Sequence, residues 1–106
     1  KLWGVKSIYI TENGTSAADE PAADGAVYDV DRIMYLRGYL SQLQRATSEG
    51  IPVSGYFLWS LIDNFEWLDG FQTRFGLYRV DFTTQRRTAK LSASFFRETI
   101  RQNALV

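Results

Sequence analysis

The sequence contains no cysteine and no histidine among its 106 residues. The absence of cysteine excludes disulfides and thiol nucleophiles, and the absence of histidine excludes the usual zinc sites and every catalytic triad that needs an imidazole. Acid–base chemistry in this chain must therefore fall to Asp, Glu, Lys, Arg or Tyr. We expect neither a metal nor a cofactor.

Net charge and long apolar runs are missing as well. The 12 basic and 12 acidic residues cancel, so no basic surface predicts binding to nucleic acid. The longest apolar stretch, near Val53 to Leu61, is too short to span a membrane, and we expect no membrane partner. A cytoplasmic location is the default expectation.

Aromatic residues, by contrast, are abundant, and many of them gather in one window between residues 56 and 78. A hydrophobic core can absorb such a cluster. A sugar-binding cleft can do so equally well, because pyranose rings present apolar C–H faces that stack on indole. Composition alone leaves both interpretations open.

The first half of the sequence predicts a strand followed by a helix. Residues 7–11 have the composition of a strand, which delivers the carboxylate of Glu12 to its end just before Asn13 and Gly14 turn the chain. After a polar loop, Asp29 is a favourable N-cap for a helix that ends at Gly50. The expected buried stripe of this helix has helical spacing and consists of Ile33, Leu36, Leu40 and Leu43.

The second half predicts another strand and a final helix. Residues 53–60 form a nearly continuous apolar run, which indicates a strand covered on both faces, as in a parallel sheet. A loop, an extended segment over residues 75–82 and a turn over 83–88 follow. The last helix is expected over residues 91–102, capped by Ser92 or a neighbour. The aromatic and aliphatic residues expected in the core of this half are Tyr56, Phe57, Tyr78, Phe95, Phe96 and Ile100.

This order of elements predicts an α/β fold that is incomplete by itself. A strand–helix–strand–helix chain has bare sheet edges on both sides and would be a poor fold alone. We therefore expect residues 1–106 to be the C-terminal quarter of a single (β/α)8 TIM barrel, its last two strands and helices, as a fragment of a larger chain. The missing N-terminal part of the barrel is then its partner. Glu12 and residues 60–67 would lie at the C-terminal strand ends, where such barrels build their active sites.

Three motifs resemble those of glycoside hydrolase family 1, the family of retaining β-glucosidases and β-galactosidases. They are ITENG at Ile10 to Gly14, DxxRIxYL at Asp29 to Leu36, and GYFLWSLIDNFEW…GF…RFGLYRVDF at Gly55 to Phe82. Their order and spacing agree over essentially the whole chain. The resemblance implies a retaining β-glycosidase, with β-glucosidase first, that acts on a β-glucoside or a short β-linked oligosaccharide through a covalent glycosyl-enzyme.

The resemblance also implies roles for single residues. In the family the Glu of the Thr-Glu-Asn-Gly motif is the nucleophile, and Glu12 matches it. The family positions that hold the non-reducing sugar match Trp59, Glu66, Trp67 and Phe75. A carboxylate at Glu66 would repel a sugar 6-phosphate. This favours an unphosphorylated sugar, with glucose ahead of galactose or fucose.

Plainer interpretations stay open for these positions. Glu12 could be a surface charge at a strand end, the two indoles could simply pack in a core, and Glu66 could form an ion pair with Arg74. For Asp63 and Asn64 we expect a structural role, in which they hold their loop through backbone hydrogen bonds. Arg74 is likewise expected to order the loop.

One part of the family's catalytic machinery has no counterpart in the sequence. The general acid/base of the family is the Glu of a Thr-x-Asn-Glu-Pro motif on an earlier strand, and the 106 residues contain no such motif. The chain alone is therefore expected to be inactive. The alternative function is non-catalytic sugar binding, or a structural fragment that complements a separate N-terminal chain.

Overall fold

The computed structural model describes residues 4–106. Its elements, in chain order, are β1 (Ile8–Asn13), α1 (Val30–Ser48), β2 (Val53–Leu58), the short 3-10 helix η1 (Trp67–Asp69), β3 (Tyr78–Val80), β4 (Arg87–Ala89) and α2 (Leu91–Gln102). The predicted order of two strands and two helices is confirmed, and α2 has the predicted bounds. The antiparallel pair of β3 and β4 was not predicted as a hairpin.

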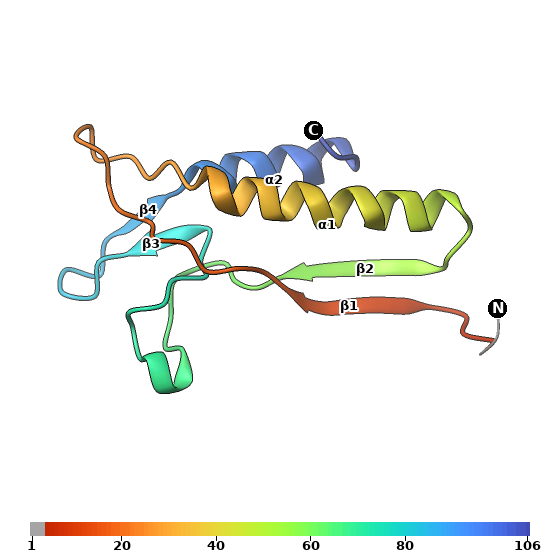
Figure 1. Cartoon of the computed structure of the whole chain (residues 1–106), viewed down its shortest axis with the longest axis horizontal. Helices are drawn as coiled ribbons and strands as arrows, with labels where there is room; N and C mark the ends of the chain where they lie inside the picture. The colour runs from red at the N-terminus through yellow and green to blue at the C-terminus, as the bar shows by residue number, and fades with distance from the viewer. Residues whose placement is uncertain (1–3) are drawn as a thin grey trace.

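Strands β1 and β2 lie side by side and parallel, joined by the crossover through α1 (Figure 1). The register pairs Ile8 with Val53 and Asn13 with Leu58. Because β1 continues to Asn13, Glu12 is the penultimate residue of the strand instead of the residue after it. The carboxyl ends of both strands, and the loops that follow them, therefore meet at one end of the molecule.

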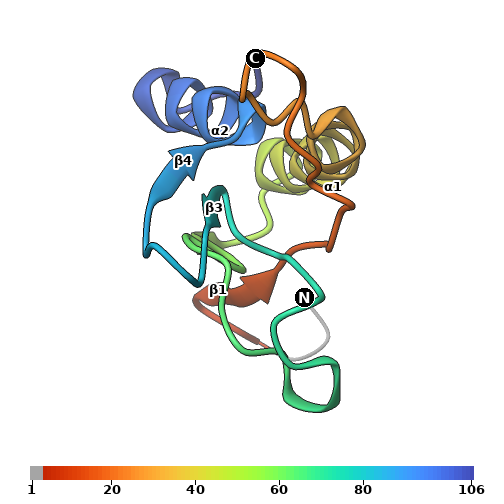
Figure 2. The ribbon, with the colours of Figure 1, turned by 90° about the vertical axis from the view of Figure 1, so that its left-hand side faces the viewer.

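Helices α1 and α2 both cover the same face of the β1–β2 pair, as the two views agree (Figures 1 and 2). The small core lies beneath them and consists of Val27, Leu36, Leu40, Leu77, Val80 and Ala93. No helix among residues 4–106 combines the length and the apolar character that crossing a membrane requires.

The expectation that β2 is covered on both faces is wrong for the residues that the structure describes. Successive side chains of a strand point to opposite faces. Phe57 remains 58% exposed, whereas its neighbour Tyr56 is half-buried. Tyr78 is exposed as well, and Ile100 at the far end of α2 is 64% exposed, although both were expected in the core. Ile100 lines an open apolar groove between α2 and β2 instead.

The helix caps also differ from prediction. Asp29 occupies the N-cap position of α1, but its carboxylate makes no capping hydrogen bond to that helix. It accepts hydrogen bonds from the backbone N–H of Ser92, at 2.9 Å, and from the Ser92 hydroxyl, both in the first turn of α2. Asp29 therefore caps α2 and not α1. A negative charge near the N-terminus of a helix is favourable. Ser92 is the residue that is capped, and not the cap.

Candidate active site

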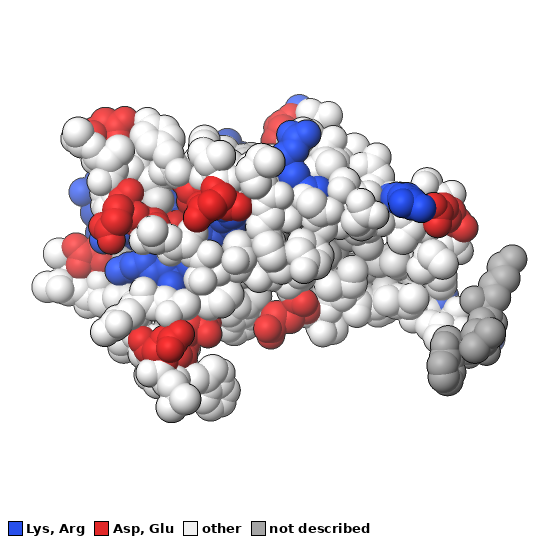
Figure 3. Space-filling model, viewed as in Figure 1, with Lys and Arg blue, Asp and Glu red and all other residues white. Residues whose placement is uncertain are grey.

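The loops that follow β1 and β2 are tied together where the two strands end. The backbone N–H of Trp59 donates to the carbonyl of Asn13 at 2.9 Å. Gly14 comes so close to this segment that a Cβ there would overlap the carbonyl oxygen of Trp59. Acidic and basic side chains gather over this loop end of the molecule (Figure 3). Glu12 itself is exposed, and its carboxylate accepts no hydrogen bond from residues 4–106.

Glu66 has the Trp59 indole as its partner. The indole Nε1–H donates to the Glu66 carboxylate at 3.0 Å. Arg74 forms its ion pair with Asp63, at 2.6 Å, and Glu66 forms none with the described residues. The interpretation of Glu66 as an ion-pair partner of Arg74 is therefore wrong. A carboxylate has about four acceptor positions, so Glu66 keeps capacity for further hydrogen bonds.

The loop between β2 and β3 is tightly turned around Glu66. The backbone N–H of Glu66 donates to the carbonyl of Gly70 at 2.6 Å. The backbone N–H of Asp69 donates to the carbonyl of Glu66 at 2.8 Å. This turn holds Trp67 at a φ of 41°, a left-handed conformation that costs an aromatic residue about 1–3 kcal/mol. Trp67 is 85% exposed. Strained backbone of this kind is concentrated at ligand sites.

At Phe75 the loop between β2 and β3 comes back to Ser60, the residue that follows Trp59. Its carbonyl accepts the backbone N–H of Ser60 at 3.2 Å, and Leu77 donates to the Ser60 carbonyl at 2.9 Å. The peptide bond between Trp59 and Ser60 is cis. Phe75 is half-buried, and its backbone bond to Ser60 sets it opposite the residue that follows Trp59.

Hydrogen bonds therefore join the segments that carry the five residues singled out in the sequence. A hydrogen-bonded path runs from the strand end of Glu12 through Asn13 to Trp59, and then through the indole to Glu66; Phe75 joins it at Ser60. Trp67 follows Glu66 directly, with its ring in solvent. Chemically, the site offers one free carboxylate, one oriented carboxylate and flat apolar surfaces. No group of three or more Asp or Glu side chains within residues 4–106 could hold a metal ion.

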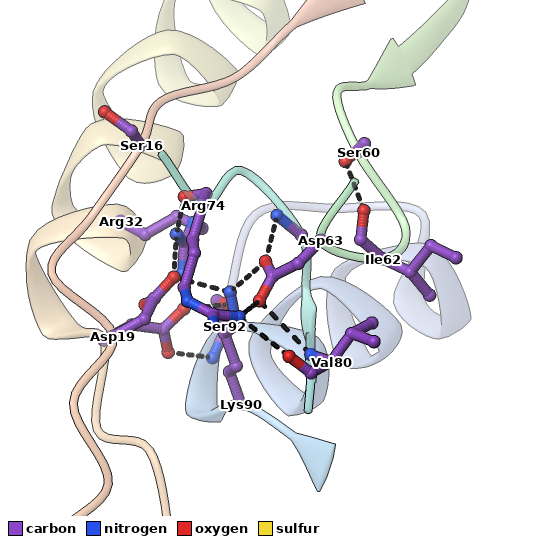
Figure 4. Close-up of polar contacts among 12 residues, drawn as sticks. Ser16, Asp19, Arg32, Ser60, Ile62, Asp63, Arg74, Val80, Lys90 and Ser92 are labelled. Carbon is purple, nitrogen blue, oxygen red and sulfur yellow. Dashed lines mark hydrogen bonds and ion pairs between the residues drawn. The ribbon is translucent and has the colours of Figure 1, made fainter. Parts of the chain in front are cut away.

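A buried cluster of charges lies beneath these loops (Figure 4). Asp63 accepts from Lys90 at 2.8 Å and from Arg74, and Lys90 also bonds Asp19 in the loop after β1. Arg32 of α1 pairs with Asp19 and Asp29 and also donates to the carbonyl of Arg74. Three positive and three negative side chains therefore balance within the buried cluster, which consists of Asp19, Asp29, Asp63, Arg32, Arg74 and Lys90.

This buried cluster confirms the structural roles expected in the loop. Asp63 also accepts the backbone N–H groups of Gly76 and Val80. Asn64 donates to the Ser60 hydroxyl and to the Ile62 carbonyl. The contribution of Asp19 and Lys90 was missed. Residues so far apart in the sequence, at positions 19 and 90, carry no local signal of their contact.

The charges of the buried cluster are maintained by their partners. Burial raises the pKa of Asp63, but the hydrogen bonds from Lys90 and Arg74 outweigh it and hold this pKa below its ordinary value. Burial likewise lowers the pKa of Arg32, and the bonds and charges of Asp19 and Asp29 outweigh it in the opposite direction. Asp63 and Arg32 therefore remain charged at neutral pH.

Replacing Asp63 by Asn in the full-length protein is expected to lower the free energy of unfolding by about 3–5 kcal/mol at pH 7, because it leaves buried cations short of a partner. Urea unfolding followed by tryptophan fluorescence measures the change. Since the folded-state pKa of Asp63 is lowered, the stabilisation is complete above the ordinary value of 3.8 and is lost as the pH falls through the lowered value. The difference in the free energy of unfolding between the parent and Asp63→Asn should therefore shrink as the pH falls through this lowered pKa.

The matched control is Glu49→Gln, which breaks the exposed pair with Arg45 at the end of α1. Exposed pairs contribute about 0–1 kcal/mol, so this variant should unfold almost as the parent does. Equal stabilities for Asp63→Asn and Glu49→Gln would contradict the structural importance of the buried cluster.

Comparison with known proteins places this chain in a family. The family model for Glycosyl hydrolase family 1 matches residues 1–105. The chain is 45% identical to Beta-glucosidase A of Thermotoga maritima over 98 residues, 92% of this chain and 22% of that protein. It is 45% identical to the 1,4-beta-D-glucan glucohydrolase of Thermotoga neapolitana over 100 residues, 94% of this chain and 22% of that protein.

The solved structures agree with the sequence relatives. The family 1 β-glucosidase from Thermotoga maritima in complex with isofagomine lactam superposes with a TM-score of 0.92 at 44% identity, covering 94% of this chain and 23% of that one. The chain spans about a quarter of the length of the curated relatives it matches. Both the sequence and the fold of this chain thus belong to glycosyl hydrolase family 1.

Proposed function

We propose that this chain is the C-terminal quarter of the (β/α)8 catalytic barrel of a retaining β-glucosidase, which removes terminal, non-reducing β-D-glucosyl residues. Several of its relatives are β-glucosidases by name, and it spans about a quarter of their length. Its parallel strands with one uncovered face are the geometry that further barrel strands would complete. The activity belongs to the full-length polypeptide, and the chain alone supplies only part of the site.

The observation that carries this proposal is the hydrogen-bonded path from the strand end to the aromatic loop. It joins the strand end that carries Glu12, through the Asn13 carbonyl, to the backbone of Trp59, whose indole donates to Glu66 at 3.0 Å. A nucleophile must be held at a defined distance from the pocket that fixes the sugar. A rigid strand end and a hydrogen-bonded loop meet this requirement.

Glu12 is proposed as the nucleophile of a double displacement. Its carboxylate oxygen attacks the anomeric carbon while the bond to the aglycone oxygen breaks, and that oxygen takes a proton from a carboxylic acid elsewhere in the barrel. Water then attacks the anomeric carbon, gives its proton to the same acid/base, and releases Glu12. The two carboxyl groups should be about 5–5.5 Å apart.

Trp59, Glu66, Trp67 and Phe75 are proposed to hold the glucosyl unit. The indole of Trp59 orients the Glu66 carboxylate and uses one of its acceptor positions. The remaining positions can accept two sugar hydroxyls in charge-assisted hydrogen bonds. The exposed indole of Trp67 is free to donate to a hydroxyl or to stack on the ring. The negative charge of Glu66 disfavours a 6-phosphate. We therefore propose unphosphorylated β-glucosides, or short β-linked oligosaccharides, as substrates.

Covalent labelling tests the assignment. A 2-deoxy-2-fluoro-β-glucoside with a good leaving group should trap the glycosyl-enzyme of the full-length protein, because fluorine slows its hydrolysis. Peptide mapping by mass spectrometry should then find the label on Glu12. A label on another residue would overturn the assignment of Glu12, and binding of the sugar without any label would favour the non-catalytic sugar-binding alternative.

A further inference from the structure

The side chain of Asn13 is held at both ends by tyrosines from two different elements. Its amide Nδ2 donates to the hydroxyl of Tyr35 on α1 at 3.1 Å. Its Oδ1 accepts from the hydroxyl of Tyr56 on β2 at 2.8 Å. The three side chains are at least partly buried, and together they join helix α1, strand β1 and strand β2. We call them the Asn13 clamp.

The Asn13 clamp lies next to the catalytic carboxylate in the chain. Asn13 directly follows Glu12, and its own carbonyl accepts the backbone N–H of Trp59 at 2.9 Å. Both the side chain and the main chain of Asn13 are therefore engaged, whereas the carboxylate of Glu12 is free. These three hydrogen bonds add to the pairing of β1 with β2 in fixing the strand end that carries Glu12.

Both tyrosines of the Asn13 clamp stay protonated. Burial, followed by the nearby hydroxyl of Tyr35, raises the pKa of Tyr56 to about 12. Its hydroxyl therefore remains a donor at any pH at which such an enzyme is assayed. Desolvation also raises the pKa of Tyr35. Both phenols therefore stay neutral, and each hydroxyl remains able to hydrogen-bond the Asn13 amide.

We propose that Tyr56 and Tyr35 are positioning residues of the glycosylation step, which act through Asn13 to hold Glu12 in line with the anomeric carbon. This inference rests on the proposed function of Glu12. The clamp side chains make no hydrogen bond to the Trp59 indole or to Glu66. Asn13 is linked to Trp59 through its backbone carbonyl, and replacing either tyrosine leaves this carbonyl in place. Loss of the clamp should therefore slow the covalent step without a comparable loss of sugar binding.

The covalent step should be more sensitive than sugar binding, because attack on the anomeric carbon requires a defined geometry. A reacting carboxylate must lie about 3–3.5 Å from the anomeric carbon with its lone pair aligned, and small displacements reduce the rate strongly. Binding of the glucosyl unit depends on hydroxyl and stacking contacts that do not include Asn13. The saturating rate of covalent labelling and the apparent dissociation constant of the labelling reagent thus report on different parts of the site.

The experiment compares Tyr56→Phe, Tyr35→Phe and the double variant with the parent full-length enzyme. Each is labelled with 2-deoxy-2-fluoro-β-glucosyl fluoride over a range of reagent concentrations, which separates the saturating rate constant from the apparent dissociation constant. Loss of one neutral hydrogen bond is worth about 2- to 10-fold, and we expect this loss in the rate constant for Tyr56→Phe. The dissociation constant should stay within about twofold of the parent's.

The matched control is Tyr9→Phe, which removes a hydroxyl from the same strand as Glu12. Tyr9 is exposed, and its hydroxyl makes no hydrogen bond within residues 4–106. This variant should label as the parent does. Thermal unfolding of all variants is measured alongside, so that a rate loss in a stably folded protein is separated from a loss of fold.

Each outcome decides one of the two proposals. A lower rate constant with an unchanged dissociation constant in Tyr56→Phe, absent from Tyr9→Phe, supports the positioning role. If the parent is labelled at Glu12 but Tyr56→Phe and Tyr35→Phe label like Tyr9→Phe, the clamp has no such role while the nucleophile stands. Equal losses in rate and affinity would make the clamp merely structural. Labelling of the parent at another residue would overturn both.

Discussion

Replacing Glu12 by Gly in the full-length enzyme is expected to reduce kcat on aryl β-glucosides on the order of 10⁴-fold or more, because the covalent intermediate can no longer form. The protein should still bind glucose, since the residues of the sugar pocket are untouched. Added azide should restore part of the turnover. A small anion can occupy the vacated space and attack from the face opposite the leaving group, which yields an α-glucosyl azide.

The measurement is the rate of aryl glycoside cleavage with and without azide, and the anomeric configuration of the product by NMR. The control is Glu20→Gly, which removes an exposed carboxylate from the loop after β1. This variant should keep the parent's kcat and show no response to azide. Substantial activity without azide in Glu12→Gly, or rescue that yields the β-azide, would contradict the proposed role of Glu12.

Replacing Glu66 by Ala is expected to lower kcat/KM for β-glucosides by about 10²–10⁴-fold. Each charge-assisted hydrogen bond contributes about 1.5–3 kcal/mol, and Glu66 is proposed to make two with the sugar. These contacts should tighten as the ring flattens toward the oxocarbenium-like transition state, so kcat should fall and not only KM rise. The loss should shrink for 4-deoxy- and 6-deoxyglucosides, which have fewer hydroxyls to bind.

The contacts of Glu66 in the structure provide two controls for the Glu66→Ala experiment. Because Arg74 pairs with Asp63 and not with Glu66, Glu66→Ala should retain the parent's stability in urea. Trp59→Phe keeps an aromatic surface but removes the N–H that orients Glu66, so it should cause a smaller loss of the same selectivity. Equal ratios of kcat/KM across glucoside and deoxyglucoside pairs for parent and Glu66→Ala would exclude Glu66 from the sugar site.

The sequence by itself determined the features that depend on residues close together in the chain. The order of strands and helices and the exact extent of α2 followed from hydrophobic spacing and from turn residues, which act over a few positions. The motifs around Glu12 and Glu66 were sufficient to indicate the family, because they extend over the whole chain. Structural roles for Asp63 and Asn64 were also predictable, since short polar side chains commonly bond the backbone of their own loop.

Only the tertiary structure decided which distant groups become partners. Asp29 looked like the cap of the helix that it precedes, yet it caps α2 and binds Ser92, 63 positions later. Glu66 had Arg74 as a plausible partner in the sequence, but the loop gives Arg74 to Asp63 and Glu66 to the Trp59 indole. The tyrosines that hold Asn13 come from α1 and β2. A polar side chain bonds whatever partner the packed elements bring within reach, and this choice is set by the crossing of helices and strands far apart in the chain.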